Sequence, residues 1–116
     1  MKYMMAIYET EADFNARTSE KKETFWGAWR AYHKAMVDAG VYVGGNALQL
    51  PATGTTVRLK GGKRHIQDGP YADTKEQLGG IIIILELPSL DAALDWAAHC
   101  PAAASGAVEV RPVLAT

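Results

Sequence analysis

Cysteine is almost absent from this sequence, since Cys100 is the only one in 116 residues. No disulfide can therefore form within the chain, and no group of Cys and His residues has the spacing of a zinc site. We accordingly expect no metal and no cofactor. A chain without disulfides suits a reducing compartment, so the expected location is the cytoplasm.

Long apolar runs and an excess of charge are also missing. The strongest apolar run, Ile81–Leu85, is far too short to span a bilayer, and the N-terminal apolar stretch reaches Glu9 too early for a signal-peptide core. The 12 Lys and Arg nearly balance the 13 Asp and Glu, which gives a formal net charge of −1. This balance provides no basic surface for nucleic acid or an anionic membrane, and we expect neither as a partner.

The composition that is present is typical of one globular domain. The chain is 48% hydrophobic and 22% charged, and its length suffices to bury a core without disulfides. It contains no solenoid repeat, low-complexity tract or linker. A single domain over residues 1–116 is therefore predicted.

Local patterns in the first third predict a strand, a loop and a helix. Residues 2–9 are dense in Tyr, Met and Ile and predict a strand, and the polar residues 10–19 predict a loop. Aromatic and apolar residues then recur at spacings of four, three and four, at Phe25, Trp29, Tyr32 and Met36. This periodicity predicts a helix with one buried stripe, which Gly40 ends.

The middle of the chain predicts a strand followed by a hairpin. Residues 41–50 read as a strand in which Gly44-Gly45 indicates a bulge or a close backbone approach. Residues 55–60 alternate with the two-residue period of a half-exposed strand, and Gly61-Gly62 is a natural turn into the returning strand 63–67. The sequence thus predicts an antiparallel excursion before the chain continues.

The last third predicts a strand, a helix and a strand. Residues 81–87 give the strongest strand signal in the chain, and Ser89 is a helix N-cap. The helix residues Leu90, Ala93, Leu94 and Ala97 share one face, Pro101 prevents continuation, and residues 107–113 form the last strand. The doubled βαβ order predicts an α+β fold of ferredoxin-like type, with an extra hairpin and two helices on one face of an antiparallel sheet.

Two strands are apolar on both faces, which bears on assembly. A sheet with helices on one side should alternate apolar and polar residues, yet Ile81–Leu85 is apolar throughout and Tyr3–Tyr8 carries no charge. Two helices in so short a chain cannot coat both faces. We therefore expect a homodimer through the sheet face, because symmetric twofold dimers are the commonest soluble oligomers.

Several separated segments resemble the DGPF-signature branch of the YCII-related family. They are the segment 68–80, which begins Asp68-Gly69-Pro70, the segments 90–101 and 108–113, and the region from Gly44-Gly45 to Leu48. Tyr71 stands where the signature has Phe, and Asp73 stands where Glu is usual. The resemblance spans nearly the whole chain.

This resemblance implies a dimeric α/β barrel in which each subunit has a pocket between its sheet and its helices. It implies no particular activity. The wider family includes proteins with a His–Asp pair implicated in catalysis and a dehydrochlorinase acting on a chlorinated aromatic ring. That His lies where this chain has Trp26–Trp29, so the pair does not carry over. Family genes often lie near alternative sigma factors, which implies a role in a regulated response.

The loop before the strongest strand contains the first candidate site residues. Asp68, Lys75 and Glu76 place two carboxylates and an ammonium beside an apolar strand, together with Asp73. Such a mixture could supply a general acid or base. The alternative is architectural, because Asp before Gly-Pro is a good turn former and Lys-Glu pairs are usually solvated.

The first long helix contains the second candidate. His33 lies seven residues after Trp26 and three after Arg30, so all three share one flank beside the buried stripe. A histidine there could act as a base near neutral pH. The alternative is a partly exposed helix residue with an aromatic neighbour and no partner.

Two functions follow from these candidates. The first is a cofactor-free enzyme that moves protons on a small aromatic or carbonyl-bearing molecule, using Asp68, Lys75, Glu76 or His33 as acid and base. The second is a module that binds or senses a small ligand as part of a regulated stress response, without catalysis. Catalysis needs a titratable group within reach of a reacting atom, whereas binding needs only an apolar cavity with a few fixed polar groups.

Overall fold

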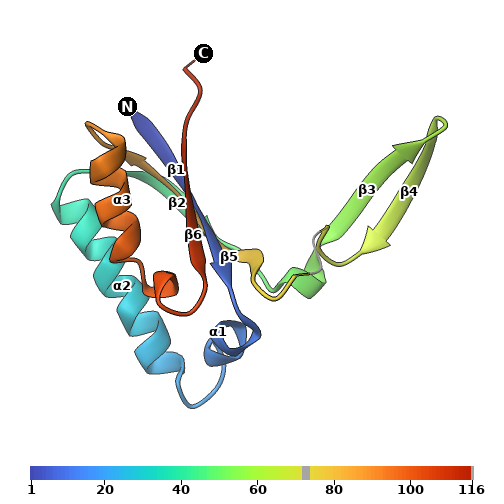
Figure 1. Cartoon of the computed structure of the whole chain (residues 1–116). Helices are drawn as coiled ribbons and strands as arrows, with labels where there is room; N and C mark the ends of the chain where they lie inside the picture. The colour runs from blue at the N-terminus through green and yellow to red at the C-terminus, as the bar shows by residue number, and fades with distance from the viewer. Residues whose placement is uncertain (72–73, 116) are drawn as a thin grey trace.

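The computed structural model describes residues 1–71 and 74–115 and is shown in Figure 1. Its elements, in chain order, are β1 (Lys2–Glu9), α1 (Glu11–Ala16), α2 (Lys22–Asp38), β2 (Tyr42–Ala47), the 3-10 turn η1 (Pro51–Thr53), β3 (Thr55–Lys60), β4 (Lys63–Asp68), β5 (Gln77–Glu86), α3 (Leu90–Ala98), the 3-10 turn η2 (Pro101–Ala103) and β6 (Ala107–Pro112). Among the residues described, no helix has the length and apolar character needed to cross a membrane.

Four strands form one antiparallel sheet in the order β2-β5-β1-β6. Figure 1 shows α2 and α3 together on one side of this sheet. Each half of the chain contributes a strand, a helix and a strand, and the β3–β4 hairpin is inserted between the halves. The predicted α+β class and antiparallel sheet are confirmed.

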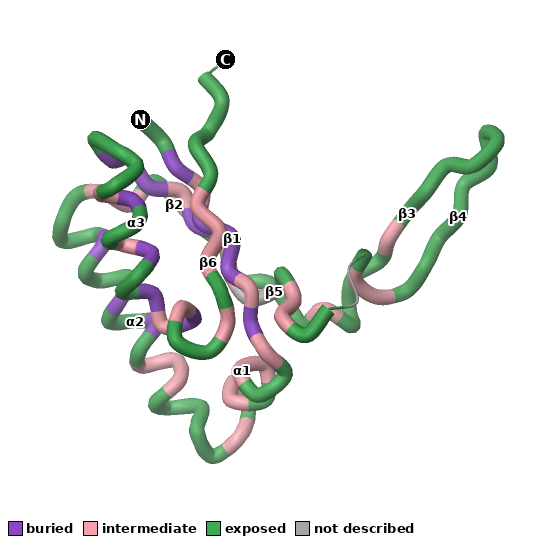
Figure 2. Tube along the Cα trace, in the orientation of Figure 1, coloured by how far each residue is buried: buried purple, intermediate pink, exposed green. Residues whose placement is uncertain are grey.

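The core lies between this sheet and the two helices. Trp29, Tyr32 and Met36 of α2 are buried, as the spacing of the stripe predicted, while Phe25 is half-buried. They pack against buried residues from β1, β5, α3 and η2, namely Tyr3, Met5, Ile7, Ile83, Leu85, Ala93, Ala97, Cys100 and Ala102. Figure 2 shows the buried residues concentrated on the inner sides of these elements. Alternation along the strands therefore places every second side chain in the core.

In the part of the chain that the structure describes, no helix covers the other face of the sheet. Ile84 lies opposite Met4, and Ile82 lies opposite Ala6, so these four side chains share the face that points away from α2 and α3. Ile82, Ile84 and Met4 remain half-exposed within one chain. We call this surface the open face. Its apolar character is what the unbroken run Ile81–Leu85 indicated.

Two details of the helices differ from the sequence-based expectations. Residues 11–16 form α1 where a loop was predicted, because Thr10 and Asp13 make a reciprocal capping box that stabilises a short helix. In α3, Ser89 is the N-cap as predicted, but Leu90 and Leu94 are exposed and only the small residues of that face are buried. The small alanine side chains allow α3 to pack closely against the sheet, whereas the longer side chains of Leu90 and Leu94 lie at the solvent-exposed edge of the core.

The β3–β4 hairpin stands apart from the main sheet. Within the described ranges its strands pair with each other and not with the main sheet, and Figure 1 shows it projecting from the body on the side away from the helices. Gly61 and Gly62 have φ of 56° and 76°, as the predicted tight turn requires. We call residues 55–68 the arm.

The Asp68-Gly69-Pro70 turn holds the root of the arm. Gly69 has φ of 95°, a conformation that a side chain opposes, and its N–H donates to the carbonyl of Gly54 at 2.7 Å. The Thr56 hydroxyl donates to the Gly69 carbonyl at 3.0 Å. These two bonds join the ends of the arm across its base, so the turn has an architectural role.

We expect Gly69→Ala to loosen the arm, because a side chain in this conformation costs about 1–2 kcal/mol. Amide hydrogen exchange in residues 55–68 should accelerate about tenfold or more, while the core helices keep their protection. Gly27→Ala, at a position of ordinary helical backbone in α2, is the matched control. It should leave the amide hydrogen exchange rates of residues 55–68 unchanged. If the amide hydrogens of residues 55–68 exchange at the same rate in Gly69→Ala and in the parent, the turn does not hold the root of the arm.

Candidate functional site

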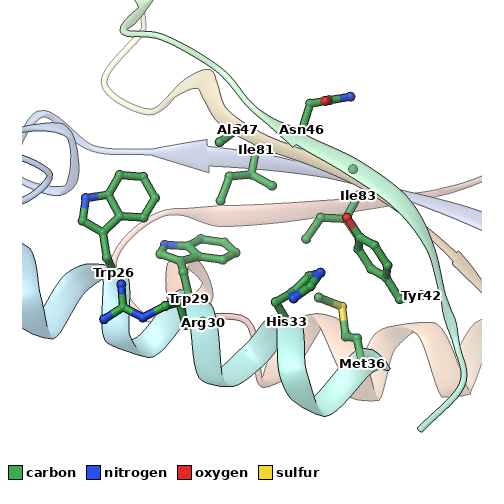
Figure 3. Close-up of a pocket in the computed structure, with 11 residues that line it drawn as sticks. Trp26, Trp29, Arg30, His33, Met36, Tyr42, Asn46, Ala47, Ile81 and Ile83 are labelled. Carbon is green, nitrogen blue, oxygen red and sulfur yellow. The ribbon is translucent and has the colours of Figure 1, made fainter. Parts of the chain in front are cut away.

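A cavity of about 460 Å³ lies between α2 and the β2 side of the sheet, as Figure 3 shows. It is lined by residues of α2, β2 and β5, namely Trp26, Trp29, Arg30, His33, Met36, Tyr42, Gly45, Asn46, Ala47, Ile81 and Ile83. β2 is an edge strand of the sheet, so the cavity opens to solvent along that edge. Its volume suits a molecule with one aromatic ring.

On the α2 side, two indole rings line the interior of the cavity and two polar side chains lie nearer the solvent. Trp29 is buried and Trp26 is half-buried, and in Figure 3 both indole rings rise from α2 towards the sheet. Arg30 and His33 are exposed at the solvent side of the same wall. The predicted common flank of Trp26, Arg30 and His33 is therefore the helix wall of this cavity.

The sheet wall places a phenol opposite the histidine. The Tyr42 ring meets the His33 ring edge to face, with centroids 4.7 Å apart and an angle of 80°. Gly45 leaves room for this phenol, since a Cβ there would lie 3.1 Å from the Tyr42 hydroxyl oxygen and 2.8 Å from the Ile82 carbonyl oxygen. The close backbone approach predicted from Gly44-Gly45 is thus present, together with a register shift between Tyr42 and Gly44.

These groups suit a planar ligand with an acidic or carbonyl oxygen. Indole and isoleucine side chains provide apolar walls, Arg30 provides a cation, and the Tyr42 hydroxyl can donate or accept a hydrogen bond. His33 contributes an imidazole, the side chain that most often serves as a general acid or base. In Figure 3 the Asn46 amide points away from the helix, so it adds little to the interior.

Arg17, whose side chain is 10% exposed, supports the Trp26 end of the cavity. The Trp26 indole N–H donates to the carbonyl of Arg17 at 3.1 Å, and the Arg17 guanidinium lies 5.6 Å from the Trp26 ring centroid. The same guanidinium donates through Nη1 to the Leu48 carbonyl at 2.7 Å. Arg17 thereby ties α1, α2 and the segment after β2 together beside the cavity.

Glu9 is the charged partner of this arginine. Its side chain is 1% exposed, and its Oε1 lies 3.5 Å from Arg17 Nη2, without a hydrogen bond at that oxygen. Burial raises the pKa of the Glu9 carboxyl above its ordinary value of 4.5, and the Arg17 charge offsets only part of that effect. The sequence offered no signal for this pair, because Glu9 ends an apolar strand and Arg17 lies in a polar stretch.

The raised pKa of Glu9 predicts how stability changes with pH. A carboxyl that holds its proton more tightly when folded contributes stability fully below pH 4.5, and this contribution is lost as the pH rises through the folded pKa. Glu9→Gln should therefore lose less stability than the parent as the pH rises from 4.5. Urea unfolding at pH 4–8 measures this, with the exposed Glu11→Gln as the control. Parallel curves for Glu9→Gln and the parent would contradict the assignment.

The structure separates the four predicted site residues. His33 lines the cavity, whereas Asp68, Lys75 and Glu76 do not. Asp68 is exposed at the end of the arm, Lys75 is exposed in a groove beside α1, and Glu76 is half-buried. Asp68, Lys75 and Glu76 therefore lie apart from His33, and Asp73 lies outside the described residues.

Cys100 contributes no nucleophile. It is buried in the core, and burial raises the pKa of its thiol to about 11. The thiol is therefore protonated at neutral pH and lacks the thiolate that reactive cysteines use.

The chain is similar to known proteins in both sequence and fold. The sequence model of the YCII-related domain matches residues 1–116. An uncharacterized protein of Rhizobium meliloti (strain 1021) is 36% identical over 116 residues, which cover 97% of this chain and 92% of that protein. Among solved structures, 5-chloro-2-hydroxyhydroquinone dehydrochlorinase of Burkholderia phenoliruptrix AC1100, in complex with 2,5-dihydroxybenzoquinone, is similar with a TM-score of 0.56 and 16% identity. That match covers 98% of this chain and 94% of the other, and it shows the fold alone.

Proposed function

Because the chain belongs to the YCII-related domain family, we propose that it acts on a small planar molecule in the cavity between α2 and β2, with His33 as the acid and base. The observation that carries the proposal is a cavity with indole walls that His33, Arg30 and Tyr42 all line, with the rings of His33 and Tyr42 in contact. Apolar clefts with a few convergent polar groups are the usual form of small-molecule sites.

The proposed ligand class is a hydroxylated aromatic or quinone-like ring that carries an ionised oxygen. Trp26 and Trp29 suit the faces of a flat ring, and Arg30 suits an anionic oxygen at the mouth of the cavity. The binding of 2,5-dihydroxybenzoquinone by a structural neighbour supports this class.

The proposed chemistry is proton transfer at a ring carbon or oxygen. The neutral His33 imidazole would accept a proton from the bound molecule, and its protonated form would return one. Arg30 would stabilise negative charge on a ligand oxygen at the Trp26 end of the cavity, and the Tyr42 hydroxyl would donate to an oxygen at the His33 end. No step requires a metal or an organic cofactor.

A binding or sensing module is the second candidate. The ring contact of His33 is with Tyr42, and no carboxylate lines the cavity to orient the imidazole among the residues described. An unoriented base transfers protons less effectively than one held by a carboxylate. The discriminating observation is whether the protein accelerates proton exchange of a molecule that it binds.

We propose the DGPF-signature branch on the Asp68-Gly69-Pro70 turn, and Asp68, Lys75 and Glu76 stay candidate acid–base residues that lie outside this cavity. We further propose a dimeric α/β barrel of ferredoxin-like type, a homodimer in which a second copy covers the open face. The half-exposed Met4, Ile82 and Ile84 support this pairing.

Arg30→Met should weaken binding of 2,5-dihydroxybenzoquinone about 10- to 100-fold, since a charge-assisted hydrogen bond contributes about 1.5–3 kcal/mol. Titration calorimetry measures the change. Lys34→Met is the control, because Lys34 is exposed on the same helix and pairs with Asp38 outside the cavity. Equal weakening by Arg30→Met and Lys34→Met would indicate a general effect of charge on binding. If the parent does not bind the quinone, hydroxylated aromatic or quinone-like rings are ruled out as the ligand class.

A further inference from the structure

One face of the arm carries its three aliphatic side chains, together with Thr55, Arg64 and Asp68, and no described residue of its own chain covers the aliphatic ones. Val57 lies directly opposite Ile66 in the hairpin, and Leu59 follows two residues along β3, so the three share a face. Their exposed fractions are 55%, 56% and 74%. Figure 2 shows the arm exposed along almost its whole length.

The opposite face of the arm is basic. Arg58 pairs with His65 and Lys60 pairs with Lys63, so cationic side chains gather on that face. Four of the 12 Lys and Arg and one of the 13 Asp and Glu lie in residues 55–68, which gives the arm a net charge of +3 and the rest of the chain −4. The arm is therefore electrostatically complementary to the body of a second copy.

An isolated two-stranded hairpin is marginally stable in water, and three exposed aliphatic side chains add a cost rather than a gain. An arm of this kind is stabilised when another surface covers its apolar face. The covering surface must lie outside the arm's own chain, because the arm extends away from the body in Figure 1.

A matching surface lies at the root of the arm. A groove of about 580 Å³ is lined there by residues that include Tyr8, Leu48, Leu50, Tyr71 and Leu78. None of the described lining residues is charged, and four of these five side chains are among the large exposed apolar residues. The groove is thus suited to the apolar face of an arm.

The groove also adjoins the open face of the sheet. Tyr8 lies opposite Leu78 where β1 pairs with β5, at the end of the strand pair that carries Ala6 and Ile82 on the open face. A second copy seated on the open face would lie on the side towards which the arm projects. The apolar arm and the apolar groove of one chain are therefore placed to meet those of a partner.

We propose that two copies of this chain exchange arms, with the apolar face of each arm seated in the root groove of the other. The arrangement is isologous, since the same two surfaces meet twice around a twofold axis and the assembly closes as a dimer. It extends the proposed pairing through the open face and does not depend on what the α2 cavity binds. In this arrangement the Asp68-Gly69-Pro70 turn sets the direction in which the arm leaves the body.

Cysteine cross-linking between differently tagged chains tests the exchange. Leu59→Cys on the arm and Leu50→Cys in the groove are made in separate chains, which are mixed, re-equilibrated and oxidised. Cys100 is buried, so the parent provides the background. We expect a mixed-tag disulfide at least tenfold above that of the control pair Arg58→Cys and Leu50→Cys, because Arg58 lies on the other face of the arm.

Three results would overturn the proposal. The first is equal cross-linking of Leu59→Cys and Arg58→Cys, and the second is no cross-linking of either in a sample that sediments as a dimer. The third is a disulfide within one chain when Leu59→Cys and Leu50→Cys are combined, since the arm would then fold back onto its own groove. The second result would leave pairing through the open face intact, so the two proposals are distinguished.

Discussion

Ile83→Asp should unfold the protein, whereas Ile84→Asp should leave a folded chain that no longer pairs. The two residues are neighbours on β5 but point to opposite faces of the sheet. Ile83 is 3% exposed in the core under the helices, and Ile84 is half-exposed on the open face opposite Met4. An unpaired charge in the core costs about 3–5 kcal/mol, a large part of the stability of a domain of this size.

Circular dichroism and sedimentation velocity separate the two outcomes. We expect loss of helical signal for Ile83→Asp, and a native spectrum with the mass of one chain for Ile84→Asp. The parent should sediment as two chains at micromolar concentration. A parent that sediments as one chain, or an Ile84→Asp variant that still sediments as two, would contradict pairing through the open face.

His33→Gln should abolish proton exchange without abolishing binding. Ring hydrogens of 2,5-dihydroxybenzoquinone exchange with D₂O through proton transfer at carbon, and we expect the protein to accelerate this exchange. Losing a general acid or base lowers a rate about 10²- to 10⁴-fold, and glutamine keeps the approximate size of the side chain. Proton NMR of the ring hydrogens measures the rate.

Lys34→Met again serves as the control, since its side chain lies outside the cavity. Its exchange rate should equal that of the parent. If the parent binds the quinone but does not accelerate exchange, the binding-module function replaces the enzymatic one. If His33→Gln retains the full rate, another group carries the proton.

Much of the fold follows from local periodicity. The four-three-four spacing of the stripe at Phe25–Met36 defines α2, because helical geometry alone places those residues on one side. Gly61-Gly62 defines the hairpin through the backbone angles that the turn requires. The flank of Trp26, Arg30 and His33 was predictable for the same reason, since positions three and four apart on a helix are neighbours.

The rest depends on contacts between distant segments. The Glu9–Arg17 ion pair joins the end of β1 to the end of α1, and no spacing in the sequence indicates it. The sheet side of the cavity could not be predicted from the sequence, because it depends on where Tyr42 lies relative to His33. Asp68, Lys75 and Glu76 form a cluster in sequence, but a loop pattern does not specify which surface each side chain reaches.

The central claim, that the cavity between α2 and β2 is a small-molecule site, is tested most directly by NMR of the tryptophan indole N–H groups. The chain has three tryptophans, of which Trp26 and Trp29 line the cavity while Trp96 lies on α3 outside it. On titration with 2,5-dihydroxybenzoquinone, we predict saturable shifts of the Trp26 and Trp29 signals and a stationary Trp96 signal. Saturable binding that shifts only Trp96, or that shifts none of the three, would contradict the claim.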